Sequence, residues 1–370
     1  MVKDSSKRSK SFYDRLWIAE LPHGLDGCKR SLRSLWSIKL LVAAHCIVRR
    51  SSRQGRVYDS ASAFTLAMIR FRRLTLEHLD AWLVDQCLAS SHARYRLRVW
   101  RENRAGLDTL RDELIDYVEE ALDDARRRIR RGFEDDLSPF RDPSNDPAAN
   151  YPALLHRVTL QGYFGEMLAV MAVEHWGAHG YMDWVVPAFL FRLHDQEFQH
   201  LEAINERLAG GEVYNPDRVE EMRPGRTGDD GLAFRINSEH TITDVLTLEA
   251  KCLAQNSNAK IEEAHQKLAA GGLRPSGVRE IINLLDEYDT PDAQAWQTAL
   301  LKLWHDGYRG ATRHDGIGYT CGRVPAQGGR VSWMSVDAPH PAYTATRRLE
   351  AMEFQFEDLT TVINTLYRGA

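Results

Sequence analysis

A carboxylate and an amine stand at alternate positions at the end of the stretch Ile242–Lys251, ITDVLTLEAK. The stretch is rich in Ile, Val, Leu and Thr, which predicts a β-strand. Side chains alternate between the two faces of a strand, so we expect Glu249 and Lys251 on one face, roughly 7 Å apart. Such a pair is either a plain ion pair or a metal ligand beside a cation that orients a water molecule.

A second predicted strand, Leu232–Ile236, precedes this stretch across the turn residues NSEH, and Asp229 and Asp230 stand just before it. If the two strands pair as a hairpin, the start of the first lies near the end of the second, which brings Asp230 beside Glu249. Two carboxylates and a backbone carbonyl form an oxygen-rich site suited to Mg²⁺. Asp244 is excluded as a ligand because it points to the opposite strand face.

The composition is that of a soluble globular protein of 370 residues, with 43% hydrophobic and 27% charged residues. Its five cysteines are scattered singly, which favours reduced thiols and argues against a disulfide framework or a zinc site. The longest apolar run, 38–48, is too short to cross a bilayer and too deep in the chain for a signal peptide. We therefore expect a cytoplasmic protein with no membrane partner.

The net charge of −4 hides a basic first hundred residues, where VRRSSRQGR and RFRRL are two of several Arg-rich stretches. A basic half on a mildly acidic chain indicates a polyanionic or acidic partner. An Arg-rich solvated surface is the equally weighted alternative.

The chain is expected to divide into two parts. Residues 1–132 read as a helical N-terminal domain, with its clearest helix at 107–129, and 133–152 reads as a linker rich in Pro, Asp and Asn. Residues 153–370 mix further helices (153–176, 185–208, 259–270, 278–285, 293–305 and the C-terminal EDLTTVINTLYR) with the hairpin and with the strand-like runs GIGYTCGRV, VSWMSV and RRLEAMEFQF. This pattern predicts an α/β domain whose mixed sheet is flanked by helices.

An Asp, a hairpin and a Glu-x-Lys on the second strand resemble the core motif of the PD-(D/E)xK nuclease superfamily, here Asp230…Glu249-Ala250-Lys251. Asp229 stands where that motif has Pro, so either Asp could be the first ligand. Over 153–370, the hairpin and the stretch DAPHPAYTATRRLEAMEFQFEDLTTVINTLY are similar to the nuclease subunit of Hachiman-type anti-phage systems. Lamassu-type defence nucleases are the second family that the chain resembles.

The resemblance implies a restriction-endonuclease-like fold and a metal-dependent DNA nuclease that uses Mg²⁺ or Mn²⁺. It implies Asp230, Glu249 and Glu166 as metal ligands, with Lys251 as the catalytic cation beside them. Glu166 is chosen because the superfamily often places a further acid on the helix before the hairpin. Gln255 and Gln266 are candidates for a supporting polar residue on the segment after Lys251.

The resemblance also implies partners, namely DNA and a helicase or SMC-like ATPase subunit that would dock on the helical N-terminal region. A second hypothesis comes from a different class: a non-catalytic assembly or regulatory subunit of a nucleic-acid-processing complex. In that case Glu249 and Lys251 form a structural ion pair. A metal at Asp230 and Glu249 would favour the enzyme, whereas an intact Glu249–Lys251 pair with Asp230 turned to solvent would favour the structural role.

Overall fold

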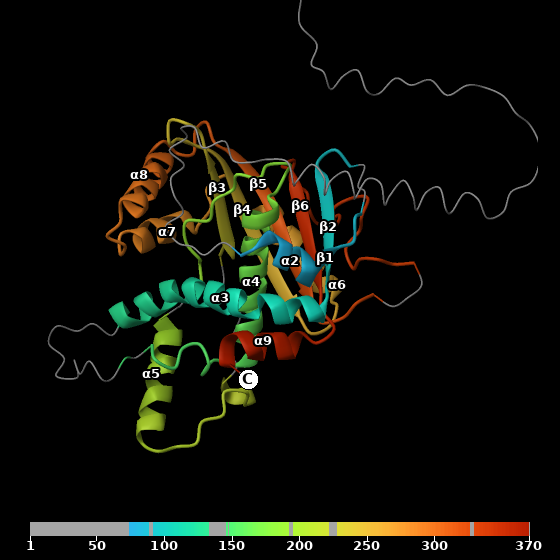
Figure 1. Ribbon diagram of the computed structural model, residues 1–370. Helices are drawn as coiled ribbons and strands as arrows, with labels where there is room; N and C mark the ends of the chain where they lie inside the picture. The colour runs from blue at the N-terminus through green and yellow to red at the C-terminus, as the bar shows by residue number, and fades with distance from the viewer. Residues whose placement is uncertain are drawn as a thin grey trace, which may run out of the picture. The chain divides into compact units, whose positions relative to one another are not determined.

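The computed structural model describes residues 74–88, 92–132, 146, 148–191, 195–221, 228–325 and 329–369. All of them belong to one compact unit of the chain, which begins at Ser60. The basic stretches before residue 74 lie outside the described residues. Within these residues, six strands form one mixed sheet (Figure 1): β1 (Leu83–Asp85), β2 (Tyr95–Glu102), β3 (Gly231–Ile236), β4 (Ile242–Leu253), β5 (Thr312–Cys321) and β6 (Leu349–Gln355).

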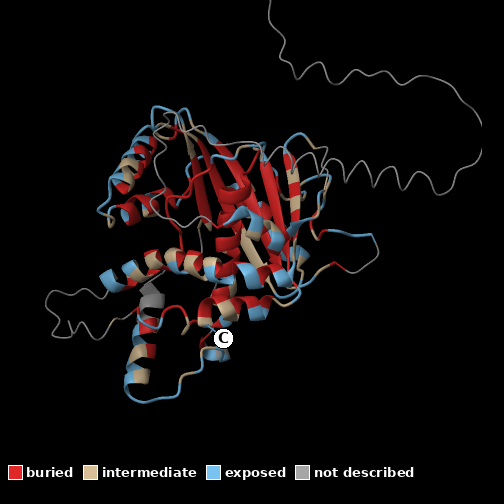
Figure 2. Ribbon diagram, viewed as in Figure 1, coloured by how far each residue is buried: buried red, intermediate tan, exposed pale blue. Residues whose placement is uncertain are grey.

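The strand order across the sheet is β1-β2-β6-β5-β4-β3. The four middle strands run parallel to one another, while β1 and β3 pair antiparallel at the two edges. Parallel neighbours need a crossover connection, and the helices between β4 and β5 supply it. Because both faces of the middle strands are covered, β5 and β6 are buried almost along their whole length (Figure 2).

Helices cover both faces of the sheet, and three of those described begin at a residue whose side chain caps the first turn. Ser257, Thr290 and Asp358 each accept a hydrogen bond from a backbone amide in the first turn of the helix that follows. The described helices are α2 (Leu76–Trp82), α3 (Arg104–Gly132), α4 (Arg157–Trp176), α5 (Asp195–Ala209), α6 (Asn258–Ala270), α7 (Val278–Leu285), α8 (Pro291–His305) and α9 (Leu359–Arg368), with a 3-10 turn at Val219–Glu221.

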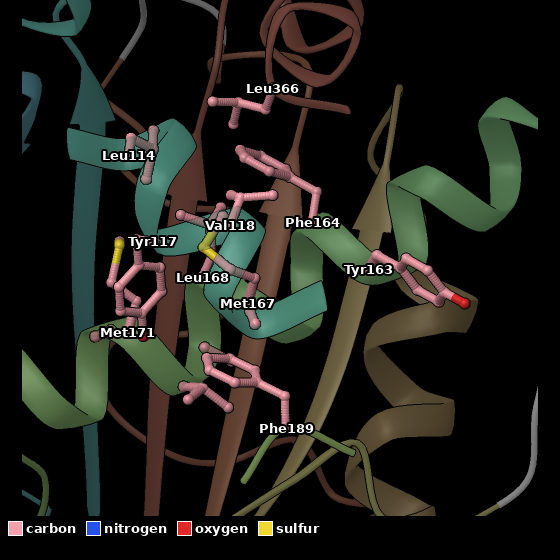
Figure 3. Packing of buried hydrophobic residues seen from close by; sticks show 14 of the residues in the cluster. Leu114, Tyr117, Val118, Tyr163, Phe164, Met167, Leu168, Met171, Phe189 and Leu366 are labelled. Atoms are coloured by element: carbon pink, nitrogen blue, oxygen red, sulfur yellow. The ribbon is translucent and has the colours of Figure 1, made fainter. Parts of the chain in front are cut away.

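Helix α4 packs against one face of the sheet and is buried along most of its length (Figure 1). Small residues let it approach the strands closely: a Cβ atom on Gly165 would lie 2.8 Å from the Cβ of Cys252, and one on Gly318 would lie 2.5 Å from the Cβ of Ala169. α3 and α9 pack on α4 as well, so one hydrophobic core joins three helices and the sheet. Figure 3 shows its members from these helices, among them Leu114, Tyr117, Phe164, Met167 and Leu366.

The other face of the sheet is covered by α6, α7 and α8. Two further clusters fill this side, one between α6 and the middle strands and one between α7, α8 and the β3–β4 hairpin. β4 divides its side chains between the two sides as alternation requires: Leu246 and Leu248 belong to the α4 core, and Val245 belongs to the α7–α8 cluster.

Most predicted elements of 153–370 are confirmed within a few residues. The hairpin strands, the helices α4 and α6 to α9, and two of the three strand-like runs of the tail are present. VSWMSV is not a strand, and the helix expected from residue 185 begins only at Asp195: residues 185–191 form no helix, and Val185 bridges to Phe234 of β3.

The expectation of an all-helical N-terminal region is wrong for residues 83–85 and 95–102, which form β1 and β2. β2 pairs in parallel with β6, so this region contributes to the same sheet as residues 231–355. α3 before the predicted linker and α4 after it also share one hydrophobic cluster. Among the described residues, the segment 133–152 therefore does not separate two cores.

Two further observations bear on the sequence expectations. Cys252 and Cys321 are free thiols, which agrees with the expectation of reduced cysteines for these two residues. Within the part of the chain that the structure describes, no helix combines the length and the apolar character that crossing a membrane requires.

Candidate functional site

The β3–β4 hairpin brings Asp230 beside Glu249, as the sequence predicts. Gly231 pairs with Leu248, which places Asp230 at the level of the residues that follow Leu248. The Asp230 N–H donates to the Leu248 carbonyl at 3.1 Å, and Asp230 Oδ2 accepts the N–H of Ala250 at 2.7 Å. Asp230 therefore continues the ladder beyond β3 with its side chain, and its second oxygen, Oδ1, remains for other partners.

Asp229 has a different role. Its Oδ2 accepts hydrogen bonds from the hydroxyl of Ser276 and from the N–H of Gly277, both at 2.9 Å. Gly277 is the N-cap of α7, so Asp229 fixes the start of that helix. Of the two candidate acids, Asp230 is the one that lies beside Glu249.

Glu249 and Lys251 share one strand face and form an ion pair. Lys251 Nζ lies 2.8 Å from Glu249 Oε1. The Glu249 side chain is only 1% exposed and that of Lys251 is 18% exposed, so this pair is largely shielded from water. Asp230, at 16%, is also mostly covered. The Glu249–Lys251 pair is intact, as the structural hypothesis expects, but Asp230 is not turned to solvent.

Helix α6 adds three charged side chains that the sequence analysis did not identify. Glu263 Oε1 lies 3.1 Å from Lys251 Nζ, and Lys260 Nζ lies 2.5 Å from Glu263 Oε2. Lys267 Nζ pairs with Glu249 Oε2 and lies 3.6 Å from Asp230 Oδ1. The result is a row of alternating charges, hereafter the ion-pair row: Lys260, Glu263, Lys251, Glu249, Lys267 and Asp230.

A signal for these residues is present in the sequence. Lys260, Glu263 and Lys267 are spaced by three and four residues in NAKIEEAHQKLAA, which places them on one side of a helix. That side is recognisable only once the packing of α6 on β4 is known. Gln255 and Gln266, the candidates from the same segment, are both exposed.

The protonation of Glu249 is set by opposing effects. Burial raises its pKa to about 7, and the negative charge of Asp230 acts in the same direction, while Lys251 and Lys267 oppose the shift. The pKa of Lys251 is raised: burial acts to lower it, and the charge of Glu249 more than offsets that effect. Glu249 therefore changes its charge close to neutral pH.

Glu166, the third ligand that the resemblance implies, is not one of the six residues of the ion-pair row. It lies on α4, which covers the opposite sheet face, and its neighbour Gly165 packs on Cys252. Burial raises the pKa of the Tyr367 hydroxyl on α9, and the charge of Glu166 adds to that increase, which places Glu166 near Tyr367. Face alternation explains the difference, because Cys252 and Lys251 are consecutive and point to opposite sides of β4.

Asp244, excluded as a ligand from the sequence, is confirmed to lie away from the site. Its carboxylate pairs with Arg235 and with His314, each at 2.8 Å. His314 lies on β5. Its ring packs near those of His179 and Trp184, two residues of the loop that follows α4. Asp244 is thus part of a separate, buried polar cluster.

The donor set can be tested against a divalent cation. Asp230 Oδ1 and Glu249 Oε2 converge on one positive group, the Lys267 ammonium, which stands where a cation between two carboxylates would lie. The Ala250 carbonyl points to the same side as its N–H, toward Asp230. Among the described residues no three His, Cys, Asp or Glu side chains form a metal cluster. Mg²⁺ is commonly held by one or two carboxylates and several waters, so the residues fit this ion.

Comparisons with known proteins assign no family to this geometry. No protein-family model matches the chain, and a search of curated proteins finds no match. The chemistry of the site is therefore inferred from its own residues and their arrangement.

Proposed function

We propose that the protein is a metal-dependent phosphodiesterase that cleaves DNA at the site formed by Asp230, Glu249 and Lys251. One observation carries the proposal: oxygens of two carboxylates converge on a single cation position, while Lys251 binds the remaining oxygen of the buried Glu249. The order of elements supports it, because a helix precedes the hairpin and another helix follows the Glu-x-Lys strand. We extend the proposal to a restriction-endonuclease-like arrangement of this core.

In this mechanism Asp230 and Glu249, with the Ala250 carbonyl, would hold Mg²⁺ or Mn²⁺. When bound, the ion polarises the scissile phosphate and lowers the pKa of a bound water. Lys251 orients the attacking water or stabilises the negative charge that grows on the phosphate oxygens. Glu249 also positions Lys251 through their 2.8 Å contact, so one carboxylate serves both groups. We assign no step to Glu166, whose helix α4 covers the opposite face of the sheet.

The substrate and partners in the proposal follow from the sequence resemblance. The Asp230…Glu249-Ala250-Lys251 motif resembles defence-associated nucleases, which suggests an effector of an anti-phage complex that works with a helicase or SMC-like ATPase. A basic first hundred residues suits a polyanionic partner.

The test is DNA cleavage by the protein, purified with its native partners, with and without Mg²⁺ and ATP. Glu249→Ala and Lys251→Ala are each expected to lower the rate of cleavage by at least about a hundredfold. Glu262→Ala, which changes an exposed carboxylate of α6, is the matched control and should cleave like the wild type. Full activity of either site variant would rule the mechanism out.

A second candidate function has its own supporting observation. Both oxygens of Glu249 are already paired with lysines, as expected of a structural ion network in an assembly subunit. In that case the wild-type complex shows no Mg²⁺-dependent cleavage, and Glu249→Ala loosens the complex instead. Metal-dependent cleavage that disappears in Glu249→Ala, with the complex still assembled, excludes this candidate.

A further inference from the structure

Lys267 is the lysine of the ion-pair row that lies close to both acids, Asp230 and Glu249. It extends from the last turn of α6 and pairs with Glu249 Oε2, while its ammonium lies 3.6 Å from Asp230 Oδ1. Its side chain is 35% exposed, whereas Glu249 is 1% exposed. The ammonium therefore reaches the buried carboxylates from the solvent side.

We propose that Lys267 is a displaceable counter-ion, which neutralises the Asp230–Glu249 pair in the metal-free protein and must leave before a divalent cation can bind there. The inference rests on the proposed function and deepens it, since it assigns a metal-gating residue to the same site.

The two cations exclude each other for reasons of space and charge. Mg²⁺ binds carboxylate oxygens at about 2.0–2.1 Å and requires near-octahedral geometry with several waters. An ammonium in contact with the same two oxygens would occupy the volume of those waters. Two positive groups that share one pair of carboxylates would also repel each other strongly at this depth. Metal binding and the Lys267 contact are therefore alternatives.

The geometry of α6 allows Lys267 to leave. Lys251 is held by its strand and sits between Glu249 and Glu263, but Lys267 belongs to the end of a helix whose C-cap, Gly271, follows four residues later. A lysine has four rotatable side-chain bonds, so the ammonium can withdraw into water without movement of the helix.

A cost of displacement lowers the apparent affinity for the metal, because only the state with Lys267 withdrawn can bind it. Removal of the ammonium removes that cost. Lys267→Met, which keeps the length and apolar body of the side chain, is therefore expected to bind Mn²⁺ about tenfold more tightly than the wild type. Lys267→Arg, which retains the charge, should bind as weakly as the wild type.

The experiment is calorimetric titration of the full chain with Mn²⁺ alone, at a pH of about 8.5, above the pKa of Glu249, so that protonation of this residue does not compete. Lys260→Met is the matched control: it removes the same charge from the same helix, but Lys260 contacts Glu263 and not the two proposed ligands. It should leave the affinity for Mn²⁺ unchanged. Thermal melting of each variant checks that it is folded.

The outcomes separate this inference from the proposed function. Tighter binding by Lys267→Met, without the same gain in Lys260→Met, supports the inference. Unchanged or weaker binding by Lys267→Met overturns it, and so does an equal gain in both variants, which would reflect net charge alone. If cleavage is metal-dependent and lost in Glu249→Ala, the proposed function survives that failure. If neither the wild type nor Lys267→Met binds Mn²⁺, both fall.

Discussion

Glu249 is a carboxylate that the fold buries almost completely and then surrounds with two ammonium groups. Burial raises its pKa to about 7, and the lysines oppose that shift without cancelling it. Above neutral pH the buried Glu249 carboxylate is ionised, and the loss of its hydration lowers the free energy of unfolding. Groups with strongly perturbed pKa values gather at functional sites, although structural ion networks produce them as well.

The pH dependence of stability tests this balance. The folded pKa of Glu249, about 7, lies above the ordinary value of 4.5, so between these values the folded chain binds a proton that the unfolded chain lacks. Stability from this group is present below pH 4.5 and is lost as the pH rises through 7. Glu249→Gln lacks this loss. Its melting temperature relative to wild type should therefore rise by roughly a few degrees between about pH 5 and pH 8.

Glu263→Gln is the control for that measurement. The Lys260 partner lowers the pKa of Glu263, so its contribution changes only below the ordinary value of 4.5. Its melting temperature relative to wild type should stay flat over the same pH range. A flat profile for both variants would mean that Glu249 is not buried as described.

At this scale, the sequence was sufficient for the residues whose positions follow from local geometry. Strand alternation placed Glu249 and Lys251 together, and the hairpin added Asp230. It was insufficient for Glu166, because which side of the sheet a preceding helix covers is a tertiary property. It was also insufficient for Lys267, whose role depends on how α6 packs on β4.

Among the elements, helix α4 packs closely on the face of the sheet opposite the ion-pair row. Gly165 lies against Cys252 of β4, the residue next to Lys251, and leaves no room for a methyl group. The position of this helix therefore acts on the end of β4 from the face opposite the ion-pair row.

Gly165→Ala is expected to push α4 off the sheet and to lower the free energy of unfolding by about 1–3 kcal/mol. Gly162→Ala, on the same helix, is the control: a Cβ there meets nothing within 4 Å, so the higher helix propensity of Ala should leave stability unchanged or raise it by up to about 1 kcal/mol. Chemical denaturation of both variants measures the difference. Equal effects would contradict the close approach.

Most helices and strands of 153–370 were predicted from the spacing of their hydrophobic residues, but β2 was not. Tyr95, Leu97 and Val99 alternate with Arg96 and Arg98, which is the two-residue period of a strand, yet the whole of 1–132 was expected to be helical. In the fold both arginines pair with the buried Glu350 of β6, 254 residues after Arg96. The alternation alone was enough to predict β2, whereas its pairing with so distant a strand was not readable from the sequence.

For the molecule as a whole, β6 is near the end of the chain and yet lies in the interior of the sheet, between β2 and β5. Without it, β2 loses its parallel neighbour, the β1–β2 pair is cut off from the rest of the sheet, and β5 becomes an unprotected edge. A chain that stops after Arg347 is therefore expected to be insoluble, whereas one that stops after Arg368 should fold normally. The soluble fraction after expression measures this. If the shorter chain were soluble and unfolded in a cooperative transition on heating, β6 would not be needed to join the two halves of the sheet.

The interior place of β6 also has a consequence for how the protein is made on the ribosome. The hairpin, α6 and β5 are translated in one continuous stretch and can assemble as they emerge, so the ion-pair row can form early. β1 and β2 emerge earlier still but must wait for more than two hundred residues to be synthesised before β6 pairs with them. Non-local parallel pairing of this kind is slow to form. The ion-pair row would thus exist on the nascent chain before the sheet is closed around β6.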